Sequence, residues 1–264
     1  MAKKNVSVPA TTTPQVPAVP ANVPTDWLLT KLEPGKPTPV AIAMQQGIRV
    51  IDLPRVKVPS GGSVAWTIPS LEGEEVSKEI VCVIATAQAN QKAWWRNGLG
   101  SGNGASAPDC SSTDGVSGDG NNSMDGAAAN NGTHLCRTCP WNQFGSARRD
   151  DGTPGAGKDC KDFTRLFLLR PNDMLPLVLA LPPTSIKGLR EFTLKLASRG
   201  LKFHQVAVRL TLESVKTPSP HSVVRFDFLG EITGKLAQIT EGYGTQLDEL
   251  LATTDSAAQG GELN

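Results

Sequence analysis

The sequence predicts a mainly β fold with some helix, and three observations support this class. Short runs rich in β-branched residues recur between Pro- and Gly-containing turns, as is typical of strands. One amphipathic segment with helical periodicity precedes the last two runs. Four of the five cysteines fall in a polar, glycine-rich stretch between two runs. We therefore expect a Greek-key barrel of the OB type with about five strands, one amphipathic helix before the last two strands, and an inserted zinc-binding module. Other small α+β meanders would give a similar order of elements.

The N-terminal segment differs in composition from the rest of the chain. Residues 1–25 contain five prolines, at positions 9, 14, 17, 20 and 24, among Thr, Ala and Val. This composition favours an extended, polyproline-biased conformation. We expect a disordered tail over residues 1–25 and an OB-like core over residues 26–236.

Five strand candidates precede the predicted helix, three before the cysteine-rich stretch and two after it. They are Ile48–Leu53, Ser63–Ile68, Glu79–Ala87, Phe163–Leu169 and Leu175–Leu181. The last two flank Arg170-Pro-Asn-Asp173, a sequence that favours a hairpin turn. Residues 97–161 separate the third candidate from the fourth, and we expect them to form the inserted module.

The helix is predicted from its caps and its periodicity. Leu181-Pro-Pro-Thr-Ser-Ile186 places prolines and hydroxyl side chains where a helix begins, and Gly200 marks its end. The apolar positions recur at helical spacing, at Ile186, Leu189, Phe192 and Leu196. Two strands, Phe203–Val215 and Ser222–Leu229, and a weak helix near Lys235–Leu251 complete the order.

Charge is unevenly distributed although the net charge is only +1. Cys136–Arg209 holds thirteen Lys and Arg against six Asp and Glu, whereas Glu241–Asn264 holds five acids and no Lys or Arg. We expect an acidic C-terminal tail over residues 237–264 beside a basic body. No apolar run approaches the roughly 18 residues that span a bilayer, and the N-terminus lacks the apolar core of a signal peptide. A cytoplasmic location without membrane attachment is therefore expected.

The cysteine cluster predicts a structural zinc site. Its members have the spacing C-x25-C-x2-C-x20-C, in a segment too polar to fold without a tether. Four thiolates around Zn²⁺ would leave no open position for catalysis. The predicted ligands are Cys110, Cys136, Cys139 and Cys160. Two alternatives stay open: His134 replaces one cysteine, or no metal binds. The fifth cysteine, Cys82, lies in an apolar run and is expected in the core.

Neither of the other patterns that could carry chemistry predicts an enzyme. Gly152–Asp159 matches a phosphate-binding loop until its last place, where Asp159 stands instead of the Ser or Thr that binds Mg²⁺. We interpret it as a glycine-rich turn of the module. The three histidines lie in unrelated contexts and the paired carboxylates are adjacent, so no catalytic group is predicted.

Aromatic residues beside basic ones indicate binding of single-stranded nucleic acid. A cationic groove with exposed aromatic faces is the usual binding surface, because bases stack on the rings. The predicted contacts are Trp94, Trp95, Arg96, Trp141, Arg148, Arg149, Lys158, Lys161 and Arg165. We expect one of the two neighbouring tryptophans to face the core and the other to stack on bases. The alternative for Trp141 is packing over the metal, and Phe163 and Phe167 are expected in the core.

Four sequence blocks resemble a family of bacteriophage-encoded proteins that bind single-stranded DNA or take part in replication. The blocks are Pro108-Asp-Cys-Ser-Ser-Thr-Asp-Gly115, Cys136-Arg-Thr-Cys-Pro-Trp-Asn-Gln-Phe-Gly-Ser-Ala147, Gly157-Lys-Asp-Cys-Lys161 and Leu181-Pro-Pro-Thr-Ser185. The resemblance covers roughly residues 80–230. It implies a zinc-bearing OB-type fold and a role in viral DNA metabolism. Together with the basic and aromatic residues, it leads us to expect sequence-nonspecific binding of single-stranded DNA in phage replication or recombination. The acidic tail is expected to contact viral or host replication proteins. The alternative is an accessory module that docks on a polymerase without its own affinity for DNA.

Overall fold

The computed structural model describes residues 23–70, 73–96, 108–121, 131–148, 152–216 and 220–260. Most of the predicted N-terminal tail, residues 1–22, lies outside these ranges. The described part is mainly β with helices, which confirms the predicted class. The sheets are open, so closure into a barrel is not observed in this part of the chain.

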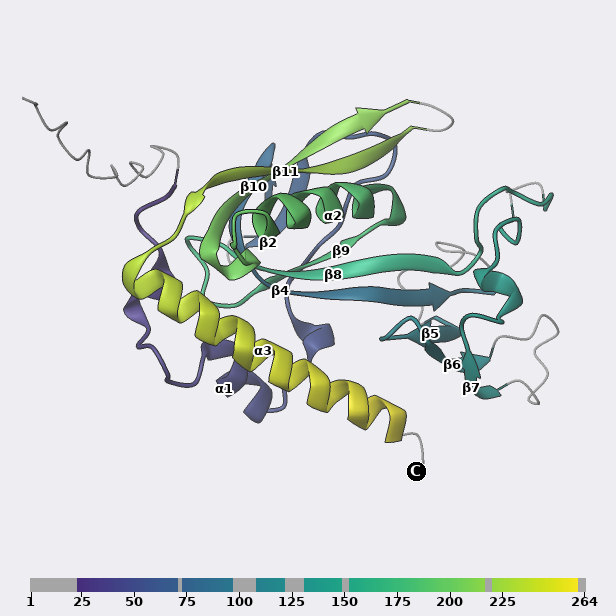
Figure 1. Ribbon diagram of the computed structural model, residues 1–264, viewed down its shortest axis with the longest axis horizontal. Helices are drawn as coiled ribbons and strands as arrows, with labels where there is room; N and C mark the ends of the chain where they lie inside the picture. The colour runs from purple at the N-terminus through teal and green to yellow at the C-terminus, as the bar shows by residue number, and fades with distance from the viewer. Residues whose placement is uncertain are drawn as a thin grey trace, which may run out of the picture.

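One long strand organises the main sheet (Figure 1). This strand, β4 (Glu79–Trp94), pairs antiparallel with β8 (Lys161–Leu169) and, near its N-terminal end, with β10 (Val206–Val215). β8 in turn pairs with β9 (Leu177–Leu181), and β10 pairs with β11 (His221–Glu231). The resulting order is β9-β8-β4-β10-β11.

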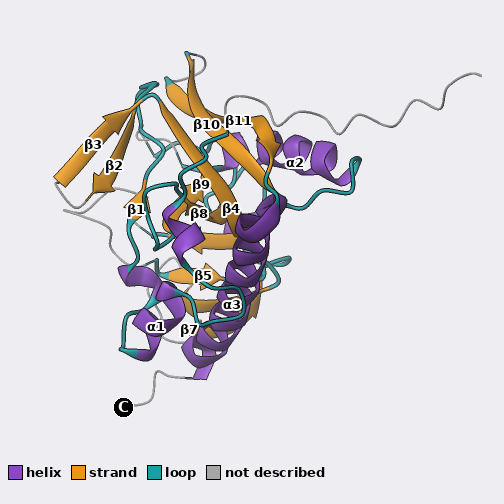
Figure 2. Ribbon diagram, turned by 90° about the vertical axis from the view of Figure 1, so that its left-hand side faces the viewer, coloured by secondary structure: helices purple, strands orange, loops and turns teal. Residues whose placement is uncertain are grey.

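Short strands extend or flank this sheet. β1 (Arg55–Val56) pairs parallel with the outer edge of β9. β2 (Trp66–Ser70) and β3 (Gly73–Ser77) form a separate hairpin, which projects at the upper left of Figure 2. β4 runs seven residues beyond the predicted end at Ala87, and its register with β8 shifts between Ile84 and Thr86 and again between Gln88 and Gln91. Bulges of this kind bend a strand and change the direction of its end.

The predicted amphipathic helix is confirmed as α2 (Pro183–Ala197), between β9 and β10. Its apolar stripe, Leu189, Phe192 and Leu196, is buried in the first core cluster, where α2 packs against β11 and β8. Ser185 does not cap the helix. Its fully buried hydroxyl instead accepts a hydrogen bond from the Val224 amide at 3.0 Å, which satisfies a group on the free edge of β11.

Cys82 is confirmed as a core thiol, with no exposed surface, in the same cluster. Burial raises the pKa of its thiol far above the ordinary value. It is therefore inert packing.

The opposite face of the sheet is covered by the N-terminal segment and the C-terminal helix. α1 (Pro39–Gln45) and two short 3₁₀ turns, Leu28–Lys31 and Val50–Asp52, lie on this side. The predicted strand Ile48–Leu53 is therefore wrong. Val50 and Leu53, three residues apart, both turn into the core, and Asp52 accepts a hydrogen bond from the Arg49 amide at 2.9 Å.

The C-terminal helix α3 (Gly234–Gly260) is longer than predicted and belongs to the folded body. Its residues Ile239, Tyr243, Leu247 and Leu251 are buried against the sheet. At Gly244 the helix backbone touches β4, since an added Cβ would lie 2.6 Å from the Ala85 carbonyl oxygen. The predicted boundary at residue 237 is thus inside the core, and the acidic segment begins as an ordered helix rather than a free tail.

The inserted residues form a small extension at the end of β4. β5 (Cys110–Ser112) pairs with Lys92–Trp94, β6 (Ser117–Asn121) pairs with β5, and β7 (Asn131–Leu135) pairs with β6. We call residues 108–161, as far as they are described, the cysteine module.

Candidate metal centre and nucleic-acid interface

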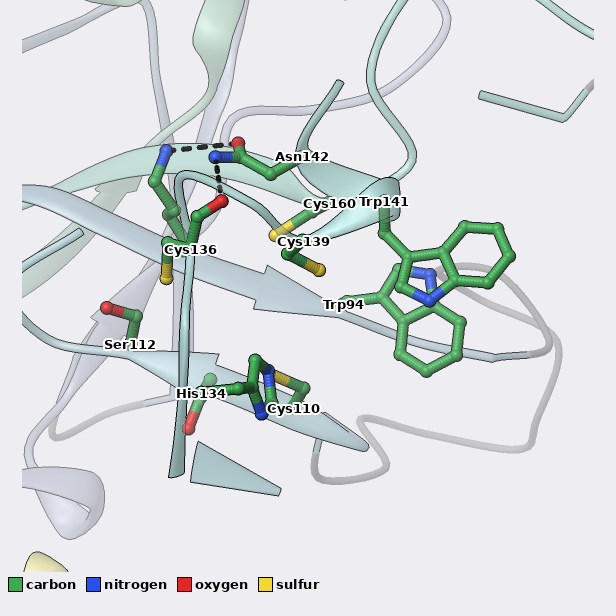
Figure 3. A pocket seen from close by; sticks show the side chains of 11 residues that line it. Trp94, Cys110, Ser112, His134, Cys136, Cys139, Trp141, Asn142 and Cys160 are labelled. Carbon is green, nitrogen blue, oxygen red and sulfur yellow. Dashed lines mark hydrogen bonds between the residues drawn. The ribbon is translucent and has the colours of Figure 1, made fainter. Parts of the chain in front are cut away.

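The fold brings all four predicted ligands to one small cavity of about 10 Å³ (Figure 3). Cys110 begins β5, Cys136 and Cys139 lie in the turn after β7, and Cys160 directly precedes β8. All four are buried and unbridged by disulfides. A cavity of this size holds a single water-sized atom.

The turn between the paired cysteines is fixed by its own hydrogen bonds. The Cys139 amide donates to the Cys136 carbonyl at 3.3 Å, and the Asn142 side-chain amide donates to the same oxygen at 2.8 Å. Pro140 then starts a 3₁₀ turn, Pro140–Asn142. The two thiols therefore have a defined spacing without any ligand.

A glycine opposite the thiols gives them room. A Cβ added at Gly118 would lie 3.2 Å from Cys110 Sγ, 3.3 Å from His134 Nε2 and 3.4 Å from Cys136 Sγ. This residue was not predicted, because a glycine in a glycine-rich segment has no distinguishing signal. The convergence of three metal-binding atoms on it is visible only in three dimensions.

His134 is a fifth potential ligand of the same cavity. Its Nε2 lies 3.2 Å from Cys110 Sγ, and its Nδ1 lies 3.1 Å from the Gly132 carbonyl oxygen. A backbone carbonyl at Nδ1 is the usual outer partner of a histidine that binds metal through Nε2. The alternative in which His134 replaces a cysteine therefore stays open.

Burial raises the thiol pKa of three of the four cysteines, Cys110, Cys136 and Cys160. It raises the pKa of Cys110 and of Cys160 to about 12, with repulsion from neighbouring thiols adding to the shift. Thiolates bind metals and thiols do not, so a cation entering this cavity has to displace protons.

The four cysteines and His134 are residue types that suit zinc, but their side chains do not surround a common point as they would around a bound ion. Thiolate and imidazole are the ligands zinc prefers. In the described part of the chain, however, no three His, Cys, Asp or Glu side chains are positioned to hold an ion directly. Binding would therefore require the thiols to turn inward around the cavity.

Two tryptophans connect the cavity to the sheet. Trp94 at the end of β4 and Trp141 from the module stack with centroids 5.1 Å apart and planes 10° apart, and both pack with Cys110 and Cys160. Trp94 is 1% exposed, so its predicted contact with a base is wrong for this conformation. Trp95 is half-buried. Trp141 packs against Cys110 and Cys160, the position that the alternative prediction for this residue requires.

Cations lie at both ends of this tryptophan stack. The Arg148 guanidinium lies 5.1 Å from the Trp141 ring centroid and that of Arg96 lies 6.0 Å from Trp94. Arg148 is exposed, whereas the predicted contact Arg149 lies outside the described residues.

Phe144 is the most exposed large apolar residue of the described chain, at 80%. The Lys158 ammonium lies 5.2 Å from its ring centroid. Phe144 was not among the predicted contacts, although the stretch Trp141–Phe144 lies close to Arg148 and Arg149 in the sequence. An exposed ring beside a cation is a common feature of surfaces that bind single-stranded nucleic acid.

The remaining predicted cations lie on or next to β8. Lys158 pairs with Asp162 at 3.4 Å, and Lys161 donates to the Lys158 carbonyl at 2.8 Å. Arg165 donates to Gln88 Oε1 at 3.1 Å. Lys92, which was not predicted, also pairs with Asp162. Burial alone would raise the pKa of the Asp162 carboxyl, but Lys92 and Lys158 together lower it below its ordinary value.

One face of β8 is buried at the C-terminal end of the strand and partly exposed at its N-terminal end. Alternate strand residues share a face, so Lys161, Phe163 and Arg165 lie on the same face as Phe167 and Leu169. Phe167 and Leu169 are fully buried under the α3 side of the core, as predicted for Phe167. Phe163 is only half-buried, contrary to its prediction, and lies between two cations.

The glycine-rich segment is a turn of the module. The amides of Gly145 and Ala147 donate to the Gly157 carbonyl at 2.9 and 3.0 Å, and the Gly155 amide donates to the Ala147 carbonyl at 2.6 Å. The Asp159 amide likewise donates to Ser146 Oγ at 3.0 Å. These amides are used internally rather than offered to a phosphate, which supports the interpretation as a turn.

Comparisons with protein-family models, with curated proteins and with solved structures found no match. Within the described ranges, no helix combines the length and apolar character that a membrane crossing requires.

Proposed function

We propose that this chain binds single-stranded DNA without sequence preference, through a surface built by the cysteine module and the adjoining half of β8, and that it is not an enzyme. The observation that carries the proposal is Phe144, 80% exposed with Lys158 over its ring. Beside it in the sequence, the ring of Trp141 carries exposed Arg148. Exposed Phe144 offers a ring on which a base can stack, and the cations beside both rings offer contacts to phosphate.

The strand order supports an OB-like assignment. The order β9-β8-β4-β10-β11, with α2 between β9 and β10, follows that of an OB barrel up to the closing pair. In this reading the cysteine module is the loop between the first two barrel strands. That loop is one of the two through which OB barrels bind oligonucleotides.

The position of α3 limits where a strand of DNA could lie. Phe167 and Leu169 are buried on the α3 side, so this part of the outer face is not accessible. Lys161, Phe163 and Arg165 continue the same face toward the module. A single strand would therefore cross this half of β8 and the turn that carries Phe144.

Zinc would be held by Cys110, Cys136, Cys139 and Cys160, or by His134 in place of one of them. When bound, zinc would crosslink three separate chain segments, and it would have no open position for catalysis. The chain's own contribution is the turn of Cys136 to Asn142, the space at Gly118 and the tryptophan stack. The resemblance to phage proteins supports a role in phage DNA replication or recombination, with replication proteins as partners.

A salt titration of binding to oligo-dT and to duplex DNA tests the proposal. We expect tighter binding to the single strand, with the logarithm of affinity falling linearly with the logarithm of salt. Phe144→Ala should weaken binding to oligo-dT by roughly tenfold, since a stacked base contributes about 1–3 kcal/mol. Phe228→Ala is the matched control, because Phe228 is 37% exposed and carries Arg199 at 5.7 Å, outside the module.

Equal affinity for both DNA forms, or no binding, would contradict the proposal. Absent DNA binding together with a stable co-purifying replication protein would favour the alternative of an interaction module. Equal losses from the two phenylalanine variants would show that the module is not the binding surface.

A further inference from the structure

The outer face of α2 is strongly basic. Residues 187–202 hold five Lys and Arg and a single acid. The exposed cations Lys187, Arg190 and Lys195 lie on the helix, and exposed Arg199 and Lys202 follow its C-terminal end. The acid, Glu191, lies 3.9 Å from Lys187. Leu194, at the centre of this face, is 70% exposed.

The outer face of α3 has the opposite charge. Glu241 and Glu249 are exposed, on the side opposite the buried stripe Ile239–Leu251. Asp248 is also exposed but faces the sheet, where it accepts a hydrogen bond from Thr86 of β4. Residues 241–264 contain five acids and no Lys or Arg. The two long helices of the chain thus present complementary charge.

These two faces cannot meet within one chain. α2 packs in the core cluster on one side of the sheet and α3 packs in the cluster on the other side. Figure 1 shows α2 above strands β4 and β8 and α3 below them. Contact between the basic and acidic faces therefore requires two copies.

We propose that copies of this chain associate head to tail, with the α2 face of one copy against the acidic α3 face of the next. Such a contact is heterologous: each new copy leaves one basic and one acidic face unused, so the assembly can continue. Complementary charge would set the orientation of the copies and Leu194 would be covered in the contact. This inference does not depend on DNA binding, although head-to-tail growth would make such binding cooperative.

Sedimentation of the full chain without nucleic acid tests this proposal. We expect the mass to increase with protein concentration at low salt and to fall toward that of a monomer at high salt. Two charge reversals are compared: Arg190→Glu with Lys195→Glu on α2, and Glu241→Lys with Glu249→Lys on α3. Each variant alone should lose association by at least about tenfold, since like charges then face each other. An equimolar mixture of the two should recover it.

The control carries Lys57→Glu with Lys78→Glu, two exposed lysines outside both helices, and has the same change in net charge as the α2 variant. It should associate like the wild type. A monomeric wild type at low salt, failure of the mixture to associate, or equal loss in the control would overturn the proposal. So would an α2 variant that still associates but loses affinity for oligo-dT, because the basic face would then bind DNA instead.

Discussion

Trp94 stacks on Trp141 with ring planes only 10° apart, and this contact joins the end of β4 to the cysteine module. Trp94 also donates from Nε1 to Asp159 Oδ2 at 2.8 Å, next to Cys160 in the chain. One side chain therefore connects the main sheet with the turn and with the segment that leads into β8. The module is positioned by the sheet as well as by its cysteines.

Trp94→Ala should detach the module from the sheet. Truncating a fully buried tryptophan typically costs about 3–5 kcal/mol of unfolding free energy. Denaturant unfolding of the zinc-free protein measures this loss. Trp95→Ala, at the half-buried neighbouring position, is the control and should cost clearly less. Equal losses would show that the stack does not hold the module.

Gly118→Ala should weaken zinc binding by roughly tenfold or more, since the added methyl group would lie within 3.4 Å of two cysteine sulfurs and the His134 ring. Competition with a chromophoric chelator measures the affinity. Gly157→Ala is the matched control in the same module, because its Cβ would meet the Ala147 methyl group at an ordinary 3.7 Å. Unchanged zinc affinity in Gly118→Ala would place the ion elsewhere.

Two glycines of α3 should respond oppositely to alanine. Gly242→Ala meets nothing within 4 Å and should stabilise the protein by about 0.5–1 kcal/mol, as alanine does in a helix. Gly244→Ala would bring a Cβ to 2.6 Å from the Ala85 carbonyl oxygen and should destabilise it. Thermal unfolding of both variants checks this. A stabilised Gly244→Ala protein would contradict the docking of α3 on β4.

Stability should depend on pH with opposite signs in the zinc-free and zinc-loaded protein. Burial raises the pKa of Cys110 and Cys160 from 9.0 to about 12. Without zinc, the folded chain keeps protons that the unfolded chain releases, so the unfolding free energy falls as pH rises from 9.0 toward about 12. Zinc binds thiolates, so its apparent affinity rises with pH and is lost on acidification. Denaturant unfolding under reducing conditions at a series of pH values measures both trends.

The sequence predicted the elements whose patterns are periodic. The stripe Leu189, Phe192 and Leu196 marked α2, and β8 followed from its alternating apolar residues. The strand predicted at Ile48–Leu53 was wrong, because two apolar residues three positions apart, Val50 and Leu53, fit a tight turn as well as a strand. In α3 the acidic residues masked the four-residue period of Ile239, Tyr243, Leu247 and Leu251 that buries the helix.

The candidate site was predicted only in part, for a physical reason. Clustered cysteines carry their chemistry in their residue type, so candidate ligands could be named from spacing alone, and the structure brings them to one cavity. Gly118, Lys92 and Phe144 act through their surroundings, which depend on the pairing of β5 to β7 in a segment without apolar alternation. For the same reason Trp94 and Trp95 could not be assigned to inside and outside before the sheet was known.

The most direct test compares the affinity of zinc-loaded and chelator-stripped protein for the same single-stranded oligonucleotide, under reducing conditions and at fixed salt. If an ion tethers the turn that holds Trp141 and Phe144, stripping should reduce affinity by roughly tenfold or more, and added zinc should restore it. A purified chain that contains no zinc, or that binds the oligonucleotide equally well after stripping, would contradict the account.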